Sequence, residues 1–206
     1  TVTSKRMNVS RTVSADVYAG GLFGYVDYAS NANGFTFEYE KNVVDVSMDI
    51  ETKSSVMEYL GGLAGYYMGV ADGETWFRNN QVKAVIASSN PDAYLVQMGG
   101  LVAALIEKNT NGGDNGLYLN SLGNELTLAM KAASTQAVRA GGLYGILRTK
   151  PGQDPYGVVI TTSKVKAVDG KNLIETTAST VEEIRAGGIV GVVDNSTVSL
   201  NISQSH

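Results

Sequence analysis

The chain has 206 residues, among them 24 glycines, one histidine and no cysteine. Without cysteine it can form neither disulfides nor thiolate metal sites. The single His206 speaks against a multi-histidine zinc site and against a histidine-based catalytic triad. A net charge of −4 argues against a nucleic-acid-binding protein, which usually carries a basic patch. No apolar run is long enough to span a bilayer, so we expect no membrane insertion. The hydrophobic content of 43% is sufficient for a folded core.

The two ends of the chain show no targeting signal and no obvious stop. Residue 1 is threonine and is not followed by a signal peptide pattern. At the other end, the alternation of Val198, Leu200 and Ile202 continues almost to the last residue. We therefore expect one domain over 1–206 that is a fragment of a longer protein.

A Gly-Gly doublet recurs five times in the same setting, and it is the strongest signal in the sequence. Each doublet is followed by leucine or isoleucine, and by glycine or alanine two residues later, in segments 18–24, 59–65, 97–103, 139–145 and 185–191. The doublets begin at 20, 61, 99, 141 and 187, so the spacings are 41, 38, 42 and 46 residues. A common element with variable spacing indicates structural repeats that differ in loop length.

Two further alternating segments belong to each repeat. Runs with an apolar residue at every second position precede the doublets, for example at 44–50, 82–86 and 126–130, and others follow them, for example at 35–39, 158–160 and 198–202. Such alternation is typical of strands. Loops rich in glycine, asparagine, aspartate and proline separate the doublet from the following strand, and a polar corner leads to the next repeat.

Three strands per repeat of about 41 residues predict an all-β fold, a parallel β-helix (β-solenoid) of about five rungs. The usual crossover rule makes it right-handed. A β-propeller has repeats of similar length, but its blades need four strands. We keep the propeller as the minor alternative.

Equivalent positions of stacked rungs form columns, and the columns around the doublet differ sharply in character. The column Leu22, Leu63, Leu101, Leu143 and Ile189 fits a buried core. Glycine columns on either side of it indicate close approach of an opposite wall, or a bend in the strand. The other face of the same strand is also apolar, which leaves two explanations open. Either the long loops cover it, or it is an exposed patch for self-association or a partner.

The Gly-Gly-Leu-x-Gly element, followed by an alternating strand, a polar corner and another alternating strand, resembles the GLUG motif of bacterial surface proteins. The matching residues are Gly20 to Gly24, Gly61 to Gly65, Gly141 to Gly145 and Gly187 to Gly191, while the third copy has Ala103 in place of the last glycine. The resemblance implies a secreted or cell-surface stalk or adhesive module, without a catalytic site and without a cofactor.

One column carries the candidate partner-binding residues Tyr18, Tyr59, Arg139 and Arg185, with Gln97 between the two halves. Aromatic and guanidinium groups in a row could form a ligand-binding stripe. The competing interpretation is a solvated rim whose long side chains lie along the surface.

Three other groups offer weaker signals. The carboxylates Asp45, Asp49 and Glu51 alternate on one strand face, where catalytic pairs can occur, but they lie opposite apolar residues and fit a solvated outer face. The loop 111–115 has oxygen ligands for Ca²⁺ but a single carboxylate, which favours a plain turn. Trp76 could stack on a sugar, but a single tryptophan is more often in the core.

These observations predict a structural and adhesive extracellular domain of a bacterial surface protein, not an enzyme. Its variable loops at 27–34, 69–75, 107–116 and 148–157 would contact a host protein, a matrix protein or a glycan. One alternative is a carbohydrate-active β-helix enzyme, such as a polysaccharide lyase or glycosidase. Another is a fibre module that self-associates as a trimer.

Overall fold

A computed structural model describes residues 2–11, 15–27, 36–70, 74–108, 118–148, 157–178, 180–194 and 199–206. This part of the chain consists of strands and connecting turns, without a helix, and the paired strands all run parallel. The strands form four sheets, which we call A, B, C and D.

Sheet A contains β1 (Val2–Arg11), β5 (Val43–Thr52), β9 (Gln81–Ser88), β13 (Glu125–Ala132), β17 (Lys164–Ala167) and β18 (Ile174–Thr176). Sheet B contains β2 (Val17–Gly20), β6 (Met57–Gly61), β10 (Leu95–Gly99), β14 (Ala137–Gly141) and β19 (Glu183–Gly187). Sheet C contains β3 (Phe23–Asp27), β7 (Ala64–Val70), β11 (Val102–Lys108), β15 (Tyr144–Arg148) and β20 (Val190–Asp194). Sheet D contains β4 (Thr36–Glu40), β8 (Glu74–Arg78), β12 (Tyr118–Leu122), β16 (Gly157–Thr161) and β21 (Ser199–Ser203).

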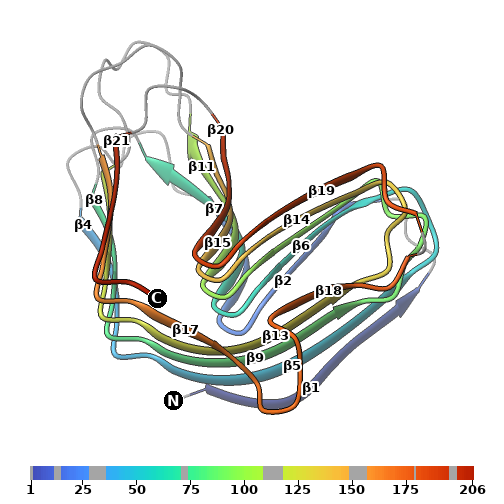
Figure 1. The fold of residues 1–206 in the computed structure, drawn as a ribbon, viewed down its shortest axis with the longest axis horizontal. Coiled ribbons are helices and arrows are strands. Elements are labelled where there is room, and N and C mark those ends of the chain that lie inside the picture. Colours follow the sequence, from blue (N-terminus) through green and yellow to red (C-terminus); the bar gives the residue numbers. More distant parts are fainter. Residues whose placement is uncertain are drawn as a thin grey trace.

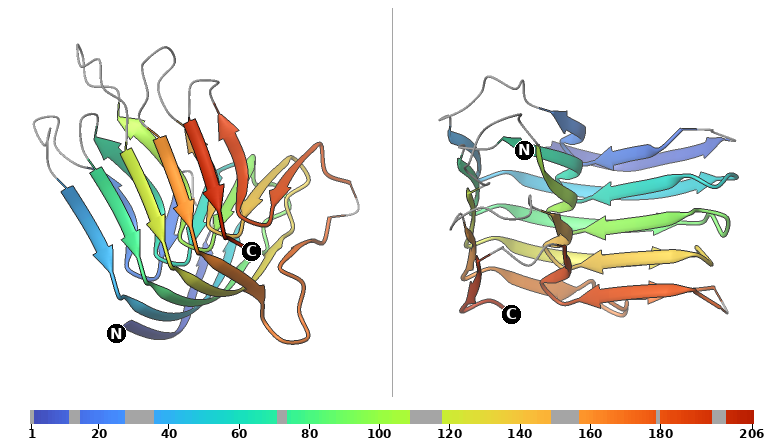
Figure 2. Two further views of the ribbon diagram at one scale, coloured as in Figure 1. Left: turned by 60° about the vertical axis from the view of Figure 1, so that its left-hand side comes forward. Right: turned by 90° about the horizontal axis from the view of Figure 1, so that it is seen from above.

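The chain passes through sheets A, B, C and D in turn and then returns to sheet A one strand further along (Figure 1). Five such rungs stack on one another, as the view from above in Figure 2 shows. The predicted parallel β-solenoid of about five rungs is therefore confirmed. Its right-handed sense stays a prediction.

The expectation of three strands per rung was wrong, because the doublet segment forms two strands rather than one. In the second rung, β6 ends at Gly61 and β7 begins at Ala64, so the chain bends between them. The neighbouring side chains of Leu63 and Ala64 consequently both point into the core, where each is almost fully buried. A single flat strand would have placed them on opposite faces.

Close packing explains the second glycine of the first four doublets. A Cβ atom on Gly62 would collide with the carbonyl oxygen of Gly100 in the next rung and lie 2.7 Å from Cγ1 of Val82 on sheet A. The bend therefore presses the backbone directly onto the inner face of sheet A. Only a residue without a side chain fits at this distance.

The core runs through all the rungs. The predicted leucine column lies at its centre, and Leu63, Leu101 and Leu143 are almost fully buried, whereas its end members Leu22 and Ile189 are partly covered. Because the chain bends at the doublet, Ala64, Val102 and Tyr144 also face this core. This part of the apolar face that the sequence left open is therefore covered by the fold itself, whereas Phe23 and Tyr25 in the first rung are exposed.

The corner from sheet D to sheet A is built the same way in successive rungs. Its first residue has a positive φ between 51° and 63°, in the series Lys41, Asn79, Gly123, Thr162 and Gln204. The next residue is polar and tucked inward, in the series Asn42, Asn80, Asn124, Ser163 and Ser205. Asn80 Nδ2 donates to Asn124 Oδ1 at 2.8 Å, and Asn42 Nδ2 donates to Asn80 Oδ1 at 2.9 Å. The predicted polar corner is thus an asparagine ladder along the solenoid axis.

The last rung departs from this regularity on sheet A. There β17 and β18 both pair with β13, and residues 168–173 between them leave the sheet (Figure 1). The predicted variable loops connect sheets C and D and lie mostly outside the described residues. In the described part of the chain, no helix has the length and apolar character needed to cross a membrane.

Candidate functional site

The bend at the doublet brings the outer faces of sheets B and C toward each other. The two sheets diverge from the bend in Figure 1. Side chains of both sheets pack against one another in the angle between them, with Tyr59, Ala104 and Ile146 in a small buried cluster, and the outer surface over this angle is called the notch. Its sheet B column is Tyr18, Tyr59, Gln97, Arg139 and Arg185. Its sheet C column is Tyr25, Tyr66, Ala104, Ile146 and Val192.

Glycines on both sides of the bend let the two walls touch. A Cβ atom on Gly65 of sheet C would lie 2.5 Å from the carbonyl oxygen of Tyr59 on sheet B. A Cβ atom on Gly61 would collide with the carbonyl oxygen of Ala64. The glycine columns therefore determine how closely the backbones of sheets B and C approach each other. The sequence predicted such a close approach for them.

Four tyrosines fill the notch in the first two rungs. Tyr18 stacks on Tyr59 with ring centroids 5.1 Å apart, and Tyr25 stacks on Tyr66 at 5.2 Å. Across the notch the rings meet edge to face, with Tyr59 and Tyr66 at 5.1 Å and an interplanar angle of 88°. Each such pair contributes about 0.5–1.5 kcal/mol beyond the burial of its area. The array both joins the two sheets and presents an aromatic surface.

The outer pair of this array is accessible to a partner and the inner pair much less so. Tyr18 and Tyr25 are 36% and 46% exposed, whereas Tyr59 is 9% exposed. Burial raises the pKa of Tyr59 to about 12, and the neighbouring Tyr18, Tyr66 and Asp16 add to the rise, while Arg148 opposes it. The pKa values of Tyr18 and Tyr66 are also raised, mainly by burial.

The raised pKa of Tyr59 gives an expected pH dependence. The folded state holds the phenol proton more tightly than the unfolded chain, whose tyrosines ionise near pH 10. The stabilisation from Tyr59 is therefore complete below about pH 10 and is lost as the pH rises toward about 12. We expect an ultraviolet tyrosinate titration to lose a late ionisation step in Tyr59→Phe, and alkaline unfolding of the variant to be less steep. Loss of an early ionisation step in Tyr59→Phe would contradict the assigned burial of this phenol.

Charged side chains replace the tyrosines in the fourth and fifth rungs. Arg139 donates to Glu183 Oε1 at 2.9 Å, and Arg185 pairs with the same carboxylate at 3.1 Å. These arginines hold the pKa of Glu183 below its ordinary value, with the hydrogen bond from Arg139 as the largest cause. On the opposite wall, Arg148 pairs with Asp194 at 2.8 Å. The notch therefore changes from aromatic to ionic along the solenoid axis.

The four residues predicted to form one column do so, and the structure adds what the sequence did not show. Tyr18 and Arg185 are exposed enough to reach a partner, whereas Tyr59 and Arg139 lie deeper. Gln97 is buried between the two halves, and its Oε1 atom has no hydrogen-bond partner. Tyr25 and Tyr66 were expected on the second apolar face of the doublet segment, which was one candidate surface for a partner. Their position opposite Tyr18 and Tyr59 was not predicted, because it depends on the bend.

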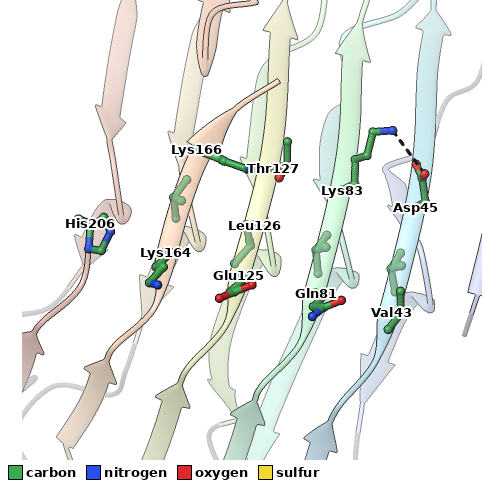
Figure 3. A pocket seen from close by; sticks show the side chains of 13 residues that line it. Val43, Asp45, Gln81, Lys83, Glu125, Leu126, Thr127, Lys164, Lys166 and His206 are labelled. Carbon is green, nitrogen blue, oxygen red and sulfur yellow. Dashed lines mark ion pairs between the residues drawn. The ribbon is translucent and has the colours of Figure 1, made fainter. Parts of the chain in front are cut away.

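A shallow trough of about 540 Å³ crosses the outer face of sheet A (Figure 3). It lies between two outward-facing columns and is lined by Val43, Asp45, Gln81, Lys83, Glu125, Thr127, Lys164, Lys166 and His206, with the strand backbone between them. Lys83 pairs with Asp45 at 3.5 Å. Such a surface can hydrogen-bond a polar ligand, but the two carboxylates Asp45 and Glu125 lie two rungs apart.

The carboxylates singled out in the sequence lie on sheet A. Asp45 lies on its outer face, and Asp49 accepts a hydrogen bond from Ser89 Oγ at 3.4 Å.

Trp76 was expected in the core, but it lies half-buried on the outer face of sheet D because it alternates with the buried Phe77. There its indole donates to Glu74, and Arg78 lies 4.7 Å above the ring.

The loop 111–115 lies outside the described residues. Among the residues that are described, no three aspartate, glutamate or histidine side chains gather as a metal site would require.

No family model matches this chain, and neither the curated proteins nor the solved structures contain a match to it.

Proposed function

We propose that this chain is a structural and adhesive module of a bacterial surface protein, held outside the cell, which binds a partner in the notch. The observation that carries the proposal is the continuous column of Tyr18, Tyr59, Gln97, Arg139 and Arg185 on one wall of the notch. The resemblance of the doublet segments to the GLUG motif supports the surface location. The variable loops, which connect sheets C and D in the sequence, would add contacts.

The chemistry of the notch favours an elongated partner that combines an apolar face with negative charge. The exposed rings of Tyr18 and Tyr25 suit stacking with the C–H face of a sugar or with an aromatic side chain. Arg185, half exposed, remains available to a carboxylate or sulfate even though it also pairs with Glu183. A glycan with acidic groups, or an extended acidic peptide from a host or matrix protein, satisfies both ends.

The proposal is tested by binding measurements on a glycan array and on immobilised matrix proteins. The first hit is then titrated against Tyr18→Ala and Arg185→Ala. We expect each variant to bind at least about tenfold more weakly, equivalent to about 1.4 kcal/mol. Tyr94→Ala serves as the matched control, because Tyr94 is a more exposed tyrosine outside the notch column. Equal binding by all three variants would place the partner elsewhere, for instance on the loops.

Two further measurements on the purified protein distinguish the adhesive module from the enzyme and from the trimeric fibre module. Release of reducing sugars or of unsaturated ends from polysaccharides would replace the adhesive proposal with a carbohydrate-active enzyme. The trough on sheet A is where such activity would be sought, although the spacing of two rungs places Asp45 and Glu125 about 10 Å apart or more. A fixed mass of three chains in solution would favour the trimeric fibre module.

A further inference from the structure

The outer face of sheet D carries Trp76, the only tryptophan of the chain. The left view of Figure 2 shows this sheet in front, with its strands side by side. Every second residue of each strand points outward. Register places Trp76, Asn120 and Val159 in one outward column across β8, β12 and β16, in the middle rungs of the stack. The surface called the tryptophan patch consists of Glu38, Glu74, Trp76, Arg78 and Asn120.

Two buried N–H donors of this patch have no acceptor in the protein. Asn120 is 7% exposed, and its Nδ2 atom has no hydrogen-bond partner. The same is true of the buried Nε atom of Arg78, which is the diagonal neighbour of Asn120 because it pairs with Leu122 in register. Among the buried side-chain atoms of the described residues, these two are the only nitrogens without a partner. Since a buried donor without an acceptor costs free energy, this pair favours a bound ligand that supplies acceptors.

The other polar groups of the tryptophan patch are already paired. Trp76 Nε1 donates to Glu74 Oε2 at 3.0 Å, and the guanidinium carbon of Arg78 lies 4.7 Å from the centre of the indole ring. Arg78 Nη2 in turn forms an ion pair with Glu38 Oε1 at 2.5 Å. These contacts restrain the ring and the guanidinium before a ligand arrives, which lowers the conformational cost of binding.

The charges of the patch determine which chemistry the ligand has. The two carboxylates of Glu38 and Glu74 outnumber the single guanidinium of Arg78, so an acidic ligand is repelled. An ammonium group is unsuitable for a different reason, because it brings only donors and the unpartnered groups are donors too. An uncharged ligand with many hydroxyl oxygens and an apolar face remains, and a neutral sugar has both properties.

We propose that the tryptophan patch binds a neutral sugar residue of a polysaccharide. The C–H face of the sugar packs against the exposed part of Trp76, and its hydroxyl oxygens accept hydrogen bonds from the Asn120 amide and the Arg78 guanidinium. The Cβ–Cγ torsion of asparagine is soft, so the amide turns outward without a change in the strand. The site is separate from the notch, because sheet D is not part of the notch, and it takes a ligand of different charge.

Trp76 makes the test direct, because all tryptophan fluorescence of the chain comes from this patch. The probes are neutral oligosaccharides of glucose, xylose, mannose and N-acetylglucosamine, each at millimolar concentration. We expect at least one of them to shift the emission of Trp76 and to protect it from quenching by acrylamide. If none of the four sugars changes emission or quenching, water satisfies the two donors and the proposal is wrong.

Two variants at Asn120 test the proposed hydrogen bond with the oligosaccharide that responds. Asn120→Ala and Asn120→Leu both remove the donor, and the leucine keeps the volume of the side chain so that the surrounding packing is retained. We expect the Kd of each variant to rise at least about fivefold, as for the loss of one hydrogen bond. Circular dichroism verifies that both variants are folded. A Kd equal to that of the parent chain in a folded variant would contradict the proposed site.

The matched control lies in the same outward column. Asn201 is exposed and is two rungs beyond Asn120, so Asn201→Ala should bind the sugar like the parent chain. Tyr18→Ala in the notch should also leave the fluorescence response unchanged, and Asn120→Ala should leave binding in the notch unchanged, so failure of one site is seen independently of the other. Equal protection of Trp76 by an oligogalacturonate or by an uncharged peptide would show that the ligand class is wrong.

Discussion

Replacing Gly142 by alanine is expected to destabilise the folded protein by more than about 4 kcal/mol. The added Cβ atom would collide with the carbonyl oxygen of Gly188 and lie 2.8 Å from Cγ1 of Val165. Backbone hydrogen bonds from Gly142 to Gly187 and from Leu143 to Ile189 hold the bend of the last rung against this position, and Val165 belongs to sheet A. For a chain of this size we expect the Tm to fall by about 8–16 °C, measured by circular dichroism.

The last rung contains the matched control for this substitution. Gly188 occupies the same column as Gly142, but no atom lies within 4 Å of its would-be Cβ, and its φ is not positive. Gly188→Ala should therefore change the Tm by less than about 2 °C. If both variants unfold at the same temperature, close packing onto sheet A is not the reason for the second glycine.

Replacing Asn80 by alanine is expected to cost about 3 kcal/mol, because its side chain is the centre of the asparagine ladder. It accepts hydrogen bonds from the backbone and side-chain nitrogens of Asn42, and it donates to Tyr39 O and Asn124 Oδ1. Asn80 is fully buried, so water cannot replace these partners. Urea unfolding should show a lower midpoint with an unchanged slope.

Two further variants distinguish the loss of the ladder's hydrogen bonds from the loss of side-chain volume. Asn42→Ala removes one side-chain donor at the end of the ladder, and we expect it to cost about 1 kcal/mol. Asn80→Ser should fall between the two, because Ser163 occupies the same corner position in a later rung. A cost for Asn42→Ala equal to that for Asn80→Ala would argue against a ladder in which the central residue matters most.

The repeat, the parallel stacking and the membership of each column could all be predicted from the sequence. They depend on the Gly-Gly-Leu core, whose spacing is visible without any structure. The bend at the doublet could not be predicted, because alternation on either side of Gly62 is equally compatible with one continuous strand. Glycine marks close approach or bending, and only the packing against Val82 shows that both occur here.

The candidate site was predictable to a similar extent. The column from Tyr18 to Arg185 follows from register alone, whereas its opposite wall depends on the angle between sheets B and C. Trp76 was misplaced for a related reason. Burial of a tryptophan depends on which face of its strand is inside, and the alternation of Thr75, Trp76 and Phe77 is apolar enough on both faces to permit either assignment.

The stacking of rungs also determines the height of the solenoid for a given number of residues. Each rung of about 41 residues adds one strand spacing, about 4.8 Å, so five rungs are only about 24 Å high. An α-helix covers the same height with about 16 residues. This architecture is therefore poorly suited to carrying a binding site far from a cell. What each rung adds instead is perimeter, divided among four strands that place side chains on the outer faces of sheets A, B, C and D.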